Sequence, residues 1–278
     1  EAGALAFLQP HKRVVNASVL LKALEYVKII DKKIVVYATD FNIVPGAFIH
    51  EGNTNVKIGM RGIPDFSEEL LVKQYVELLR YTNSALHISG VSSARSLRCI
   101  KEAKEEGLNI SADTSIYNLM FSENELLDFD TNYKLNPPLR SLEDKLALIE
   151  AVKSGLIDAV TSKHAPQHED DKKTEMKMAE FGVIGLQTMF SAMLQVFTMD
   201  ETISILTKRN RSIFKVEVPK IEIDEIANFS LFSPNQKWTY DLKNNLSKSE
   251  KSMFLGKELF GKTVGVINGA HYNLNGID

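Results

Sequence analysis

Residues 85–112 have the sequence ALHISGVSSARSLRCIKEAKEEGLNISA, and this stretch decides the fold class. A short apolar run at 85–89 precedes a segment, 94–106, whose apolar residues recur at the three- and four-residue spacing of a helix. A second apolar run follows at 108–112. A strand, a helix and a strand in this order predict a βαβ unit with two parallel strands.

The same alternation continues on both sides of this unit. It predicts further strands at 4–7, 34–38 and 157–161, and further helices at 18–30, 67–81, 141–153 and 185–197. A closed (β/α)8 barrel takes eight strands and roughly 250 residues, and this chain offers five strand candidates before the pattern changes. We therefore predict an α/β fold with a (β/α)8 TIM-type barrel that is incomplete in this chain and occupies residues 1–208.

The last quarter of the chain has a different pattern. Short strand-like runs at 230–232, 237–240 and 263–267 are separated by prolines and glycines. We expect residues 209–278 to form a small β domain at the C-terminal end.

Composition excludes some function classes. The chain has 278 residues, 44% of them hydrophobic, and its 33 basic and 36 acidic residues leave a formal net charge of -3, so charge favours neither nucleic acid nor an anionic membrane as partner. The single cysteine, Cys99, is typical of a reducing compartment, and we expect a cytoplasmic protein. The chain begins at Glu1 without a methionine, from which we expect that an N-terminal part is missing.

Six stretches of the chain carry a specific pattern and follow one another in a fixed order. They are GIP at 62–64 with Glu68 and Glu69, LHISGVSS at 86–93, KLNPPLR at 134–140, IDAVTSKHAP at 157–166, FGVIGLQT at 181–188 and FLGKELFGK at 254–262. Together they resemble the dihydroorotase family of amidohydrolases. The resemblance implies a (β/α)8 barrel, a β domain built from both chain ends, homo-oligomers and a catalytic zinc site.

Four positions depart from what the resemblance implies for zinc. Family members carry metal ligands and a catalytic aspartate where this chain has Gln9 (or Pro10), Ala38, Gly90 and Lys163. Alanine and glycine side chains offer no lone pair to a metal. The positive charge of Lys163 would repel a metal ion. Two like unit charges about 4 Å apart repel by about 4 kcal/mol at an effective dielectric constant of 20, and a divalent ion roughly doubles this repulsion. We therefore expect no zinc site, no catalytic residues of the family type and no cofactor.

Other residues of these motifs are candidates for holding a ligand. The resemblance implies a substrate-binding role for Asn136, His164, Gln167 and Gly182, where Gln167 stands in place of a family histidine. A Pro-Pro turn and a His-Ala-Pro strand end also fix loop shape, so structural roles stay open for Asn136 and His164.

We also expect specific positions for two side chains. His87 lies three residues before Gly90, so strand alternation predicts that it faces the surrounding helices. The Lys163 ammonium is expected to fill the place left by the metal at the end of the last barrel strand. Its expected hydrogen-bond acceptors are Asp113, Asn136, Gln9 and backbone carbonyls. Tyr37, Asp40, Asp113 and Tyr117 are candidates for a polar floor of this site or for packing.

Three functions are compatible with these observations. The first is a non-catalytic dihydroorotase homologue of pyrimidine biosynthesis that assembles with aspartate carbamoyltransferase. The second is an active cyclic amidohydrolase that uses residues outside this chain, and the third is a sensor that binds a dihydropyrimidine-like ligand without turnover.

Overall fold

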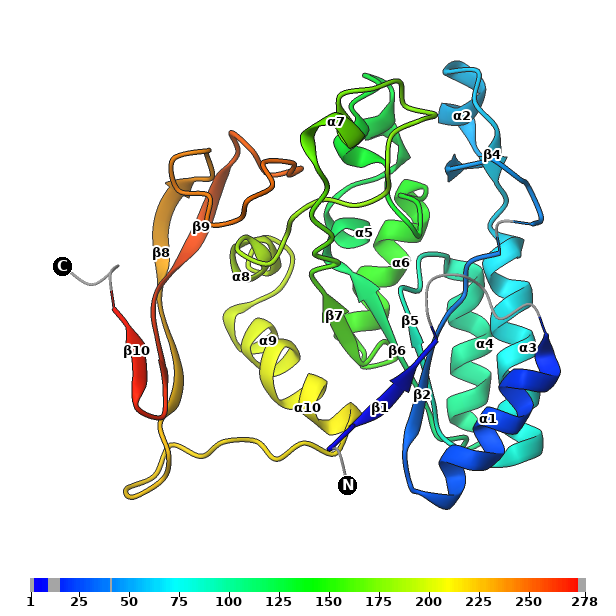
Figure 1. The fold of residues 1–278 in the computed structure, drawn as a ribbon, viewed down its shortest axis with the longest axis horizontal. Coiled ribbons are helices and arrows are strands. Elements are labelled where there is room, and N and C mark those ends of the chain that lie inside the picture. The colour runs from blue at the N-terminus through cyan, green and yellow to red at the C-terminus, as the bar shows by residue number, and fades with distance from the viewer. Residues whose placement is uncertain (1–2, 10–15, 41, 275–278) are drawn as a thin grey trace.

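The computed structural model describes residues 3–9, 16–40 and 42–274. Its centre is a sheet of five parallel strands in the order β1-β2-β5-β6-β7 (Figure 1). These strands are β1 Ala6–Leu8, β2 Lys33–Tyr37, β5 Leu86–Ser89, β6 Ile110–Ser115 and β7 Ala159–Thr161. The sheet does not close on itself within the described residues, so the predicted α/β class with an incomplete TIM-type barrel is confirmed.

Four helices follow the alternation predicted from the sequence. They are α1 Ala17–Ile29, α3 Phe66–Thr82, α4 Ala94–Glu105 and α6 Leu142–Lys153. Asn16, Ser93 and Ser141 precede α1, α4 and α6, and each side chain accepts a hydrogen bond from a free amide of the first turn. Helix α3 ends at Asn83, which adopts the left-handed conformation that stops a helix.

One face of the parallel sheet packs against these helices. Ile34 and Val36 of β2 and Leu86 and Ile88 of β5 are buried in a hydrophobic cluster that includes residues of α1, α3 and α4. Side chains alternate along a strand, so the residues between them point to the opposite face of the sheet, which is the barrel interior. This alternation decides which residues can build a site.

Shorter elements fill the long connections. A small parallel pair that the sequence pattern did not predict consists of β3 Ile49–His50 and β4 Gly62–Ile63. Short helices up to residue 172 are α2 Asn53–Lys57, α5 Ile116–Met120, η1 Glu123–Leu126, η2 Thr131–Tyr133 and α7 Glu169–Lys172.

The helix expected at 185–197 is shorter than predicted. Helix α8 covers only Met189–Met193, and the backbone amides of Gly185 and Leu186, ahead of it, donate to the His164 ring. A nearly continuous helical run follows, made of α9 Met199–Ser204, a π-helical turn η3 Ile205–Arg209 and α10 Asn210–Ile213. These helices lie between the parallel sheet and the C-terminal strands in Figure 1.

The C-terminal part is an antiparallel sheet of β8 Asn228–Thr239, β9 Glu258–Asn268 and β10 His271–Asn273. The two runs expected at 230–232 and 237–240 belong to one strand, β8, whose register shifts between Ser233 and Lys237. Pro234 lies in this interval, and a proline cannot donate to the ladder. The boundary predicted between residues 208 and 209 stays a prediction. No helix within the described ranges is long and apolar enough to cross a membrane.

Candidate functional site at the carboxyl ends of the parallel strands

A chain of polar contacts runs along the interior face of the sheet. The Ser111 hydroxyl lies 3.0 Å from the Lys33 Nζ and 2.9 Å from the His87 Nδ1. The His87 Nε2 lies 2.9 Å from the Asp113 Oδ2. Since the hydroxyl accepts from the ammonium, its own proton is available to His87 Nδ1, which leaves the proton on Nε2 to be donated to Asp113.

These contacts show that the predicted orientation of His87 is wrong. His87 faces the barrel interior with Asp113 and Ser111, and only 2% of its surface is exposed. The prediction counted alternation back from Gly90, but β5 ends at Ser89 and Gly90 has a φ of +79°. Side chains alternate between the two faces only within the extended strand, so the position of Gly90 does not indicate which face His87 occupies.

Lys163 follows β7, and its ammonium points inward, as predicted. Its Nζ lies 3.3 Å from the Ser89 hydroxyl and 4.5 Å from the centroid of the Tyr37 ring. A Cβ atom added at Gly90 would lie 3.0 Å from the same Nζ. The ammonium therefore takes the space beside residue 90. We call Tyr37, Ser89, Gly90, Asp113 and Lys163 the mouth cluster.

The electrostatics of the mouth cluster centre on one cation and one anion. Burial lowers the pKa of Lys163, and the nearby Asp113 carboxylate opposes this shift. Burial and then the charge of Asp113 raise the pKa of Tyr37. Asp113 also accepts a 2.7 Å hydrogen bond from the Gly90 amide through Oδ1, so it fixes the strand end that Lys163 contacts.

The expected acceptors of Lys163 are wrong: within the described residues its ammonium donates to Ser89 Oγ, and Asp113 acts on it only through its charge. The side-chain carbonyl oxygens of Gln9 and Asn136 are buried and have no hydrogen-bond partner in the described part of the chain. Asn136 nevertheless belongs to the neighbouring loop, because Pro137 Cδ lies 3.2 Å from the Cβ position of Gly90. Pro10 lies outside the described residues.

Ala38 lies apart from the mouth cluster. It is 4% exposed and belongs to the hydrophobic cluster against the helices, whereas Tyr37 is the residue of this strand end that meets Lys163. The assignment of Ala38 to a lost ligand position stays a prediction. Of the other polar candidates, Tyr117 is fully buried beside Phe254, and Asp40 accepts from Asn42 at an exposed turn.

The predicted ligand-holding residues of the His-Ala-Pro loop form a separate group. His164 Nδ1 accepts from the amides of Gly185 and Leu186, at 3.3 Å each, and the exposed ring lines a cavity of about 780 Å³ beside the C-terminal sheet. Gln167 Nε2 donates to the Phe181 carbonyl at 2.8 Å. These bonds hold the loops to each other.

Gly182 is required by geometry. Its φ is +108°, and a Cβ there would lie 2.6 Å from Ala165 Cβ and 2.9 Å from Ala165 O. Its amide donates to the Lys134 carbonyl at 3.1 Å. Close backbone approach accounts for this glycine, and its predicted part in substrate binding stays a prediction.

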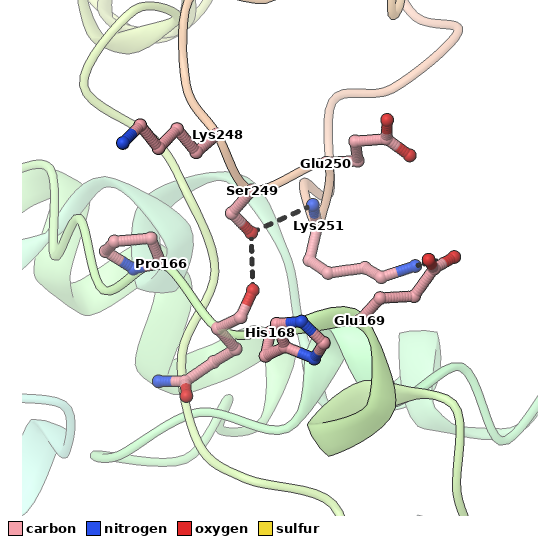
Figure 2. Close-up of a pocket in the computed structure, with 8 residues that line it drawn as sticks. Pro166, His168, Glu169, Lys248, Ser249, Glu250 and Lys251 are labelled. Atoms are coloured by element: carbon pink, nitrogen blue, oxygen red, sulfur yellow. Dashed lines mark hydrogen bonds and ion pairs between the residues drawn. The ribbon is translucent and has the colours of Figure 1, made fainter.

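A second cavity, of about 370 Å³, lies outside the mouth cluster (Figure 2). The Ser249 hydroxyl donates to the Gln167 carbonyl at 2.8 Å, and Lys251 Nζ lies 3.8 Å from Glu169. Lys248 and Glu250 also line this cavity, so its lining has as many lysines as glutamates. This arrangement joins the C-terminal segment to the His-Ala-Pro loop.

The side chains of the mouth cluster do not fit the zinc that the family resemblance implies. The described residues contain no group of three or more His, Cys, Asp or Glu side chains that could hold a metal ion. Asp113 is already bonded to His87 and to the Gly90 amide, and the neighbouring ammonium of Lys163 has no lone pair while protonated.

Comparison with known proteins identifies the family. No family model matches the chain. A dihydroorotase from Caldicellulosiruptor saccharolyticus is 36% identical over 284 residues, which cover 100% of this chain and 66% of that protein. A dihydroorotase from Bacillus subtilis is 32% identical, over 96% of this chain and 64% of that protein. The chain belongs to the dihydroorotase family. It spans about two thirds or less of the length of these relatives.

Solved structures agree on the fold. A dihydropyrimidinase from Brevibacillus agri superposes with a TM-score of 0.80 at 19% identity, over 97% of this chain and 63% of that chain. A D-hydantoinase superposes with a TM-score of 0.80 at 17% identity, over 96% of this chain and 62% of the hydantoinase chain. At these identities the likeness establishes the TIM-barrel amidohydrolase fold alone.

Proposed function

We propose that this dihydroorotase-family chain belongs to a protein that does not hydrolyse a cyclic amide through zinc and serves as a non-catalytic subunit in pyrimidine biosynthesis. The observation that carries the proposal is the position of Lys163, whose Nζ lies 3.3 Å from Ser89 Oγ and 3.0 Å from the Cβ position of Gly90. A resident ammonium in this place opposes a divalent cation, and the glycine beside it supplies no ligand.

Zinc content and turnover test the loss of chemistry. Full-length protein should carry much less than one zinc per chain and should neither open dihydroorotate nor close carbamoyl aspartate. Lys163→Ala is the matched variant, because it removes the ammonium but adds no ligand. Stoichiometric zinc with turnover that survives Lys163→Ala would falsify the proposal.

The proposed partner is aspartate carbamoyltransferase. The support is that the chain has the scaffold motifs at 136–140 and 181–186, while the described residues contain no group of three side chains that could hold a metal ion. Mixing the full-length protein with its own organism's carbamoyltransferase should give a larger complex by analytical ultracentrifugation. The protein alone, run in the same experiment, tests the predicted homo-oligomer. Separate sedimentation of the two proteins at micromolar concentration contradicts the assembly role.

An active cyclic amidohydrolase is the second candidate. It is favoured by the 36% and 32% identity to proteins named dihydroorotase, and the relatives' remaining length leaves room for ligands outside this chain. A thermal-shift titration separates it from the third candidate, a sensor. Dihydroorotate that stabilises the metal-free protein without being converted supports a sensor, whereas conversion that a chelator abolishes supports the enzyme.

A further inference from the structure

A buried ion pair joins α3 to the Pro-Pro loop, which lies beside the mouth cluster. Glu68 of α3 is 2% exposed, and Arg140, at the end of the KLNPPLR motif, is 3% exposed. The Arg140 Nη2 lies 3.7 Å from the Glu68 Oε2. Neither charge can reach water at this burial, so each depends on protein partners.

Glu68 binds the loop that follows β5. Its carboxylate accepts hydrogen bonds from the Ser92 amide at 3.1 and 3.2 Å, from the Ser92 hydroxyl at 2.5 Å and from the Ser93 amide at 3.0 Å. Ser92 and Ser93 are fully buried. These bonds fix the backbone two residues after Gly90, on the other side of the left-handed turn that places Gly90 against Lys163.

Arg140 binds the second loop and joins it to the first. Its Nε donates to the Ser92 hydroxyl at 3.1 Å, and its Nη1 donates to the Ile63 carbonyl at 3.1 Å and lies 3.2 Å from His50 Nδ1. Pro137, three residues earlier, lies 3.2 Å from the Cβ position of Gly90. The Gly90 and Pro137 loops therefore share one anchor.

We propose that Glu68 and Arg140 are positioning residues of the mouth cluster: they set the two loops that enclose the Lys163 ammonium. The pair also contributes to stability, because Glu68 accepts from the buried Ser92 and Ser93 amides, so a loss of stability does not by itself test this proposal. Loop geometry is the separate readout, because Lys163 Nζ and Pro137 Cδ lie 3.0 and 3.2 Å from the position that a Cβ would take at Gly90. This inference concerns geometry and does not depend on whether the protein turns over a substrate.

The test uses a double variant of the full-length protein, Glu68→Leu with Arg140→Met, which leaves no unpaired buried charge. The matched control is Arg80→Met with Glu106→Leu. These substitutions remove an exposed ion pair that joins α3 to the end of α4. The readout is the rate of amine modification at Lys163 between pH 6 and 10, followed by mass spectrometry. A solely structural role would not change this pH profile once the protein is folded.

We expect the double variant to modify Lys163 about tenfold faster at a given pH, or to shift its profile by about one pH unit, since one unit corresponds to a factor of ten. The control pair should leave the profile unchanged. A folded double variant with the parent's Lys163 profile overturns the proposal. If the double variant does not fold, hydrogen exchange in the parent decides. Slow exchange at the Ser92 and Ser93 amides supports the anchor, and exchange as fast as that of exposed loops overturns it.

Discussion

Replacing Gly182 by alanine tests whether this motif glycine is needed for close packing. Its φ of +108° disfavours any side chain, which costs about 1–3 kcal/mol. The added Cβ would also lie 2.6 Å from Ala165 Cβ and 2.9 Å from Ala165 O, and forcing a methyl group into packed structure costs about 1–3 kcal/mol. Gly182→Ala should therefore destabilise the protein by about 2–6 kcal/mol if both penalties apply.

Gly155 provides the matched control. It has a φ of +81°, but a Cβ there would have no atom within 4 Å. Gly155→Ala should thus incur only the backbone penalty of about 1–3 kcal/mol. The difference between the two variants isolates the contact with Ala165.

Urea unfolding of the two variants and the parent gives the free energies by linear extrapolation. Adding Ala165→Gly to Gly182→Ala should recover part of the loss, since it removes the 2.6 Å contact and leaves the contact with the carbonyl. Equal destabilisation by Gly182→Ala and Gly155→Ala refutes the packing explanation and leaves Gly182 free for the ligand-binding role that the family resemblance implies.

Two further changes should have measurable effects. Burial, and then the charge of the nearby Arg140, lowers the pKa of His50 from 6.5 to about 4. Between pH 6.5 and pH 4, His50 is therefore protonated in the unfolded chain and neutral in the folded chain. Stability should fall by up to about 3 kcal/mol as the pH drops through this window, and His50→Gln should flatten the fall in urea unfolding at pH 7 and 4.5. Lys163→Met should cost about 1 kcal/mol or less, because it loses one 3.3 Å hydrogen bond and a ring contact but keeps most of the side-chain volume. A melting temperature that falls by more than about 10 °C in Lys163→Met speaks for a larger structural role.

Local sequence patterns predicted the parallel sheet and its helices well. The apolar spacing of α3 and α4 and the capping side chains of Ser93 and Ser141 act within a few residues, so the sequence carries their effect directly. Other contacts join residues that are distant in the sequence, as where the His164 ring accepts from the amides of Gly185 and Leu186, about 20 residues later in the chain. A contact of that kind has no local signature.

The site was predicted less completely, for a similar reason. Motif order indicated that Gly90 and Lys163 matter, but only the fold shows that the Lys163 Nζ lies 3.0 Å from the position that a Cβ would take at Gly90. Alternation failed for His87 because the strand ends before Gly90. The pair Glu68 and Arg140 lies within the recognised motifs, but nothing in the spacing of residues 68 and 140 indicates that they meet.

The position of Lys163 makes residues 90 and 163 interdependent, because a Cβ at Gly90 would lie 3.0 Å from the Lys163 Nζ. Gly90→His alone would drive a side chain into the Lys163 ammonium from a left-handed backbone position. Lys163→Asp alone would empty that space and place a second carboxylate near Asp113 with no cation between them. Changing either residue alone therefore disturbs the packing or the charge balance at these strand ends. The glycine and the lysine therefore act as one structural unit, in which the ammonium supplies both the volume and the positive charge at the strand ends.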